Sequence, residues 1–209
     1  MDQKEVWSEI AIIVLTTLVL AISISFRNQA LLYVATASFL IIISINIIVK
    51  KIVGYFLEID VKTKLWAWYQ YGFRLDSHFK KPFPMVWLPL VLSLITNGAI
   101  WWLAVLEFDI KAKTERVAKR HGLYRFTQVT EWHVAWIAVW GLIANLIMAT
   151  IAYAIGFETF TKLSLYFIAW SLVPLGGLDG SKIFFGSRPL WFATATIAAI
   201  LLGWGFLIV

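Results

Sequence analysis

Six long apolar runs, separated by short and mostly basic connections, constrain this chain more than any other feature of its sequence. A helix needs about 20 mostly apolar residues to cross the hydrocarbon core of a bilayer. The sequence predicts six such spans, at residues 10–26, 30–49, 84–106, 132–155, 163–175 and 190–209. We therefore expect an all-α, multi-pass protein of the cell membrane, with about six transmembrane helices in a single polytopic domain over residues 1–209.

The composition agrees with a chain that lies mostly inside a membrane. Of its 209 residues, 61% are hydrophobic and 14% are charged, whereas a soluble domain is nearer half apolar and a quarter charged. The net charge of +6 comes from clusters between the apolar runs, which usually face lipid headgroups. No nucleic-acid-binding motif accompanies these clusters, so the expected partner is the lipid bilayer and not a nucleic acid. The absence of cysteine excludes disulfides, thiolate metal sites and cysteine nucleophiles.

Two connections between the predicted spans, 50–82 and 107–130, carry most of the basic residues. In the first, residues 61–68 alternate with a period of two, which is typical of a half-buried strand. We expect a short interfacial hairpin between spans two and three, with Trp66 and Trp68 on one face together with Lys62 and Lys64. An amphipathic helix at the interface is the alternative.

The same two connections leave the orientation of the chain undecided. One predicted span separates them, so they should lie on opposite sides of the membrane. They hold seven and six Lys and Arg residues respectively, so the positive-inside rule favours neither strongly. The charges of 107–130 are denser, which favours a cytoplasmic position for that connection. Residues 112–121 within it also have helical composition.

Polar side chains inside the predicted spans are few and are expected to face the interior of the bundle. The amides are Asn46, Asn97 and Asn145. Hydrogen bonding between helices explains such amides without any further role. Asp179 differs, because it sits in a break at 174–180 in which Pro174 and two glycines must unwind the helix. We expect this break to be non-helical and buried against the fourth predicted span, with the Asn145 amide as a donor to its freed carbonyls. Lys182 is three residues away and could pair with Asp179 on one helix face.

Two segments resemble signatures of the site-2 intramembrane metalloproteases. Residues 171–180 read Ser-Leu-Val-Pro-Leu-Gly-Gly-Leu-Asp-Gly, which is similar to the family's Asn-Pro…Leu-Asp-Gly signature. Residues 140–146 resemble its Gly-Pro-Leu-Ala-Asn-Leu helix, with Leu142 in place of Pro and with Asn145 retained. Lys80-Lys81-Pro82-Phe83-Pro84 is similar to a Lys-Pro-x-Pro turn found in many members. The resemblance covers residues 30–185 and implies that Asp179 corresponds to the family's third zinc ligand.

The family's His-Glu-x-x-His motif, which supplies two zinc ligands and the general base, is missing. Counting back from the basic segment at 50–55 places the motif at 42–46, where this chain has Ile42, Ile43 and Asn46. The resemblance therefore predicts a degenerate site made of Ile42, Ile43, Asn46, Asn145 and Asp179. We expect Asp179 to lie inside the bundle near Asn46, held by the Asn46 amide or by a bridging water.

Three functions remain open from the sequence. The first is a catalytically inactive relative of this family, a pseudoprotease without cofactor that binds a transmembrane protein partner or lipid. The second is an active zinc metalloprotease with a displaced site, built from Glu131, His133 and Asp179. The third is a small accessory subunit of a larger membrane protein complex. No serine-hydrolase, P-loop or dinucleotide signature is present.

Overall fold

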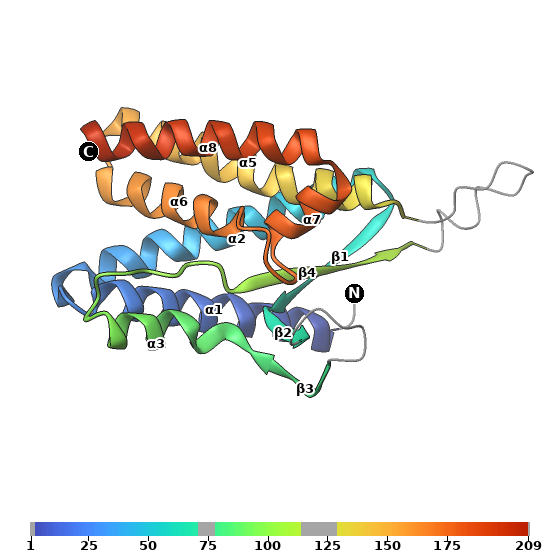
Figure 1. Cartoon of the computed structure of the whole chain (residues 1–209), viewed down its shortest axis with the longest axis horizontal. Helices are drawn as coiled ribbons and strands as arrows, with labels where there is room; N and C mark the ends of the chain where they lie inside the picture. The colour runs from blue at the N-terminus through green and yellow to red at the C-terminus, as the bar shows by residue number, and fades with distance from the viewer. Residues whose placement is uncertain (1–2, 71–77, 114–128, 209) are drawn as a thin grey trace, which may run out of the picture.

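The computed structural model describes residues 3–70, 78–113 and 129–208, and the elements run mostly parallel to one long axis (Figure 1). The helices are α1 (Gln3–Ser25), α2 (Leu32–Phe56), α3 (Leu88–Ile95), α5 (Glu131–Ile155), α6 (Glu158–Ser171), α7 (Asp179–Gly186) and α8 (Arg188–Ile208), with single 3₁₀ turns η1 (Gln29–Leu31) and η2 (Met85–Trp87). The strands are β1 (Ile59–Leu65), β2 (Ala67–Gln70), β3 (His78–Pro84) and β4 (Leu106–Ala112).

Three of the described helices are long and apolar enough to cross a membrane: Val6–Ser25, Gln29–Phe56 and Glu131–Ile155. They correspond to the first, second and fourth predicted spans. The fifth prediction falls on α6, which has only 14 residues, and the sixth falls on α8. Six spanning helices are therefore not shown among the described residues, whereas a largely helical membrane protein is supported.

The third predicted span, 84–106, is wrong. Its helix α3 ends after eight residues, and Asn97 (φ +50°) with Gly98 (φ +74°) turns the chain back in the left-handed region. The following residues return in extended form along α1 (Figure 1). Leu103, Ala104 and Val105 are at most 2% exposed. This burial fits the rule that non-helical backbone at membrane depth must be enclosed by protein.

The strands form two small antiparallel sheets instead of one local hairpin. β2 pairs with β3, so the predicted hairpin exists in this part. β1 pairs instead with β4 in the following connection, with Ile59 opposite Ala112 and Leu65 opposite Leu106. Lys80 to Pro84, predicted as a turn, lie within strand β3. Most of the helical segment expected at 112–121 lies outside the described residues, and β4 extends to Ala112.

At Trp66, between β1 and β2, the regular alternation of buried and exposed side chains is interrupted. The Trp66 N–H donates to the Val105 carbonyl at 2.9 Å and its carbonyl accepts from Met85 N–H at 3.0 Å, so it links the two sheets. Val61 and Thr63 are buried on β1, and Trp66 is buried as well. A regular strand would have put Trp66 on the exposed face of Lys64. The prediction that Trp66 shares a face with the lysines is therefore wrong.

The pairing of β1 with β4 places both basic connections at one end of the bundle (Figure 1). The prediction that they lie on opposite sides is wrong, because the segment between them enters the bundle and returns. Among the described connections at the other end, 26–31, 96–100 and 156–157, the basic residue is Arg27, and Lys162 follows in α6. With both connections at one end, the positive-inside rule predicts that this end is cytoplasmic.

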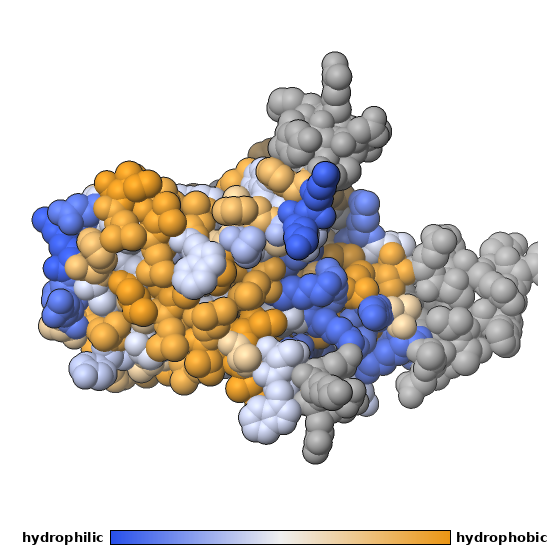
Figure 2. All heavy atoms as spheres, turned by 90° about the horizontal axis from the view of Figure 1, so that it is seen from below, coloured by the Kyte–Doolittle hydropathy of each residue, from blue (hydrophilic) through white to orange (hydrophobic). Residues whose placement is uncertain are grey.

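The core lies between the helices and contains mostly aliphatic side chains. One cluster joins α1, α2, α6 and the buried extended segment around Leu103, with Leu20, Phe39 and Ile43 fully buried. A second joins the β1–β4 sheet to α5 and α7. Outside the core, a broad apolar surface separates hydrophilic residues at the two ends of the molecule (Figure 2). Such a band is suited to the hydrocarbon layer of a membrane.

Single-cysteine labelling tests this topology directly, because the natural chain contains no cysteine. We expect Lys64→Cys and Lys111→Cys to react with a membrane-impermeant maleimide from the same, cytoplasmic side of the membrane, and Asn28→Cys to react only from the other side. All three positions are exposed. Labelling of positions 64 and 111 from opposite sides would restore the topology with a third spanning helix.

Candidate functional site

A buried ion pair between α2 and α7 is the centre of the candidate site. The Lys50 ammonium lies 2.6 Å from Asp179 Oδ2, and the two side chains are 7% and 5% exposed. Asp179 is the first residue of α7, where the helix dipole also favours a carboxylate. A charge buried at this depth is tolerated when it is paired. The prediction that Asp179 lies inside the bundle is confirmed, and its partner is Lys50.

Neither of the partners expected for Asp179 binds it. Lys182 donates instead to the Phe108 carbonyl oxygen. The Asn46 amide nitrogen and Asp179 Oδ1 are both buried and have no hydrogen-bond partner among the described residues. Lys50 was not predicted as the partner of Asp179, because it was assigned to the connection that follows the second predicted span. In the structure, α2 continues through Lys50 to Phe56.

Lys50 and Asn46 share one face of α2, since they are one helical turn apart. This face lies against Gly141 of α5. A Cβ atom on Gly141 would stand 2.7 Å from Lys50 Cε and 3.1 Å from Asn46 Nδ2, closer than real contacts allow. The glycine therefore provides the space in which both side chains reach the centre of the bundle.

Ile42 and Ile43, the other predicted members on α2, belong to the apolar core. Both are fully buried in the cluster that includes Leu20 and Phe39. The structure thus places Asn46 beside Lys50, the partner of Asp179, and places the two isoleucines among aliphatic side chains.

Asn145 of α5 is fully buried, but its role differs from the expected one. Its carbonyl oxygen accepts a hydrogen bond from Ser164 Oγ at 3.1 Å, which joins α5 to α6. Neither atom of its side-chain amide has a hydrogen-bond partner among the described residues. The prediction that this amide binds the carbonyls freed by the break near Pro174 is not met.

The break between α6 and α7 runs from Leu172 to Leu178, with Asp179 and Gly180 already helical. Ser181 Oγ satisfies two freed carbonyls, those of Gly176 at 2.6 Å and Leu178 at 2.7 Å. The predicted non-helical segment is confirmed from residue 174 to 178. Its predicted burial is wrong for residues 174–176, which are exposed.

The β1–β4 sheet covers the ion pair from the basic end of the bundle. The Phe108 ring centroid lies 4.9 Å from Lys50 Nζ and 3.8 Å from Lys182 Nζ, so two cations contact one ring. Burial lowers the pKa of Lys182 to about 8, and the nearby Asp179 opposes this shift. The site is therefore closed by an aromatic side chain and contains more than one buried charge.

Glu107, beside Phe108 on β4, adds a second buried carboxylate. It accepts a hydrogen bond from the Tyr69 hydroxyl at 3.2 Å. Burial raises the pKa of Glu107, and Lys182 and Tyr69 offset part of this rise. A Cβ atom on Gly177 would stand 2.1 Å from Glu107 Oε2. The glycine-rich break thus allows Glu107 to approach the start of α7.

The side chains of the candidate site do not fit a zinc ion. Catalytic zinc requires three protein ligands that are thiolates, imidazoles or carboxylates. Around Asp179 the site instead holds the ammonium groups of Lys50 and Lys182, the Asn46 amide and one further carboxylate, that of Glu107. Among the described residues, no group of three or more His, Asp or Glu side chains could hold a metal ion, so Glu131, His133 and Asp179 do not form one. His133 Nδ1 instead lies 2.5 Å from Thr130 Oγ1.

Comparison of the chain with protein-family models, curated protein sequences and solved structures found no match. Any assignment to a family therefore depends on the motifs and on the geometry of the candidate site.

Proposed function

We propose that this chain is a catalytically inactive relative of the site-2 intramembrane metalloproteases, and that it binds a transmembrane protein partner or lipid. The observation that carries the proposal is the buried Lys50–Asp179 pair. The resemblance assigns Asp179 to a zinc ligand, and in this chain a lysine ammonium supplies the positive charge that faces it. The cation is thus part of the polypeptide.

The geometry supports placing the lost motif at residues 46–50, one helical turn after residues 42–46. In His-Glu-x-x-His the two ligands are four residues apart and share a helix face. Asn46 and Lys50 have this spacing and both lie against Gly141. Lys50 also binds Asp179. In this register Ile47 takes the place of the general base.

These replacements remove each chemical requirement of a zinc hydrolase. An ammonium group offers no open coordination position and cannot lower the pKa of a bound water as zinc does. Ile47 has an aliphatic side chain that cannot accept a proton from water, and it is 5% exposed in an apolar cluster. The remaining arrangement can stabilise the bundle but has no nucleophile for peptide hydrolysis.

A binding role is supported by an apolar hollow between α2 and α5. Its volume is about 790 Å³, and its walls include Tyr33, Ile41, Ile151 and Phe157. Ligand cavities in proteins are commonly of 300–1,000 Å³ and mostly apolar. The hollow opens on the apolar surface, where a lipid chain or a partner helix could enter.

A gain of zinc binding tests the proposal and its register together. We expect the double variant Asn46→His, Lys50→His to bind one zinc per chain, because two imidazoles would then face Asp179. Adding Asp179→Ala should abolish this zinc. The matched control is Ile42→His, Asn46→His, which has the same spacing one turn earlier and should bind none. Zinc is measured by elemental analysis of monodisperse protein in detergent. Equal zinc in both double variants, or zinc that survives loss of Asp179, would overturn the register.

A further inference from the structure

We propose that the β2–β3 hairpin is a binding surface for anionic phospholipid headgroups at the basic end of the bundle. The basic hairpin is defined here as Ala67–Gln70 and His78–Pro84. This surface is separate from the site around Asp179 and does not depend on the proposed function. Three observations carry it: exposed lysines with no ion-pair partner in the described part of the chain, exposed aromatic rings beside them, and the position of the hairpin on the bundle.

The lysines of the basic hairpin are Lys80 and Lys81, and both are exposed. Neither forms an ion pair with any residue that the structure describes. The described strands of the hairpin also contain no Asp or Glu. Two adjacent positive charges of this kind are complementary to a phosphate-bearing surface.

The aromatic side chains around these lysines expose much of their area. Phe79, Phe83 and Trp87 are 44%, 59% and 54% exposed. Together with Trp68 and Met85, the two phenylalanines line an apolar hollow of about 160 Å³. Aromatic rings beside basic residues are typical of segments at the membrane–water interface, where one part is apolar and the other is hydrated.

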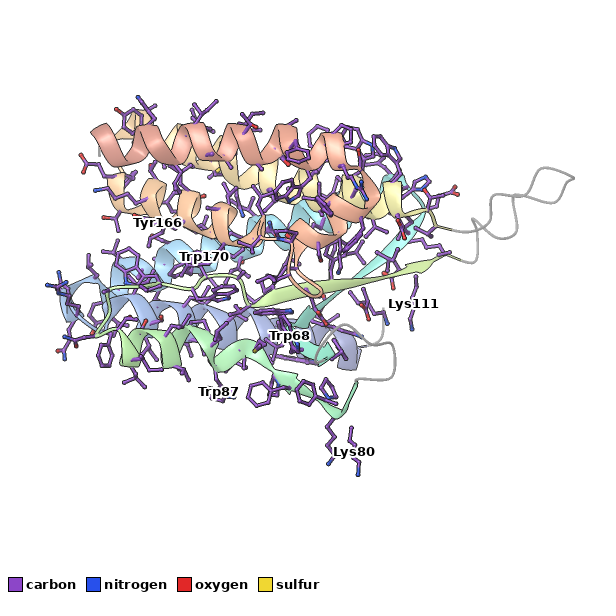
Figure 3. All side chains as sticks on the ribbon, viewed as in Figure 1. Trp68, Lys80, Trp87, Lys111, Tyr166 and Trp170 are labelled. Carbon is purple, nitrogen blue, oxygen red and sulfur yellow. The ribbon has the colours of Figure 1, made fainter. Side chains whose placement is uncertain are left out.

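The position of the basic hairpin fits this environment. It precedes η2 and α3, which pack along α1 on the outside of the bundle. Lys80 and Trp87 point away from the bundle on this outer side, and Lys111 marks the same end of the molecule (Figure 3). The hairpin therefore lies where the apolar surface ends and the headgroups begin. The basic end is expected to be cytoplasmic, and the cytoplasmic leaflet is the one that carries anionic lipid.

The test uses the purified full chain in mild detergent, presented with equal amounts of phosphatidylglycerol and phosphatidylcholine, with bound lipid counted by native mass spectrometry. We expect the natural chain to prefer phosphatidylglycerol. Each lysine at an anionic surface contributes on the order of a fivefold preference, so loss of both should reduce the ratio by roughly 30-fold. Lys80→Gln, Lys81→Gln should show this loss, and Lys80→Glu, Lys81→Glu a larger one.

The matched control reverses one exposed lysine of the same end that contacts no aromatic ring among the described residues, Lys111→Glu, and is compared with the single variant Lys80→Glu. It should leave the ratio close to that of the natural chain. An absence of preference in the natural chain would overturn the proposal. So would an equal loss in the control, which would show a general effect of net charge. Capture of an acidic protein segment by Lys80 and Lys81, with no lipid preference, would also replace the lipid assignment.

Discussion

Replacing Lys50 by methionine is expected to destabilise the fold by about 3–5 kcal/mol, because it leaves the Asp179 carboxylate buried without its cation. Asp179 Oδ1 has no hydrogen-bond partner among the described residues, and the bond from Lys50 Nζ is made to Oδ2. Methionine keeps the length of the lysine stem, and the change therefore reports the charge more than the packing. The measurement is the free energy of unfolding, obtained by titrating sodium dodecyl sulfate into the protein in mixed micelles.

Two further variants separate the buried pair from a general effect of lysine loss. Lys64→Met breaks an exposed pair with Asp109, and should cost no more than about 1 kcal/mol. The double variant Lys50→Met, Asp179→Leu removes both charges and should recover most of the lost stability. A Lys50→Met variant as stable as Lys64→Met would show that the pair in α2 and α7 is not buried.

The second large effect is expected at Gly180, in the first turn of α7. A Cβ atom there would stand 2.1 Å from the Leu172 carbonyl oxygen and 2.7 Å from that of Val173. These are backbone atoms of the break and cannot move aside as a flexible side chain can. Gly180→Ala should therefore destabilise by about 3 kcal/mol and displace Asp179 from Lys50.

Gly203 of α8 provides the matched control for this variant. No atom lies within 4 Å of a Cβ built on it, so Gly203→Ala should be neutral or should stabilise the helix by up to about 1 kcal/mol. Thermal denaturation of both variants in one detergent compares them. If Gly180→Ala unfolds at the temperature of Gly203→Ala, the close approach of α7 to residue 172 is incorrect.

The parts of the fold that follow from local chemistry were predictable. Long apolar runs specify α1, α2 and α5. Pro174 and two glycines account for the break after α6, because proline lacks a backbone donor and glycine has greater conformational freedom. The third span failed because hydropathy does not distinguish a spanning helix from a short helix followed by a buried extended segment. The pair Asn97–Gly98 was the available turn signal, and it was read as a polar position within a helix.

The parts that depend on distant contacts were not predictable. The alternating residues of β1 indicate a strand, but nothing local selects β4 as its partner. In the candidate site, Asp179 was recognised by its unusual position, whereas Lys50 was assigned to a headgroup-facing connection. Its partner is 129 residues away in the sequence, so only the tertiary structure shows why a helix can continue through this lysine.

The zinc content of the natural chain, purified after growth with excess zinc and compared with Asp179→Ala, tests the central claim most directly. If the Lys50 ammonium supplies the cation for Asp179, neither protein should hold stoichiometric zinc, and the two should give the same value. One zinc per natural chain that is lost on substitution of Asp179 would contradict the account.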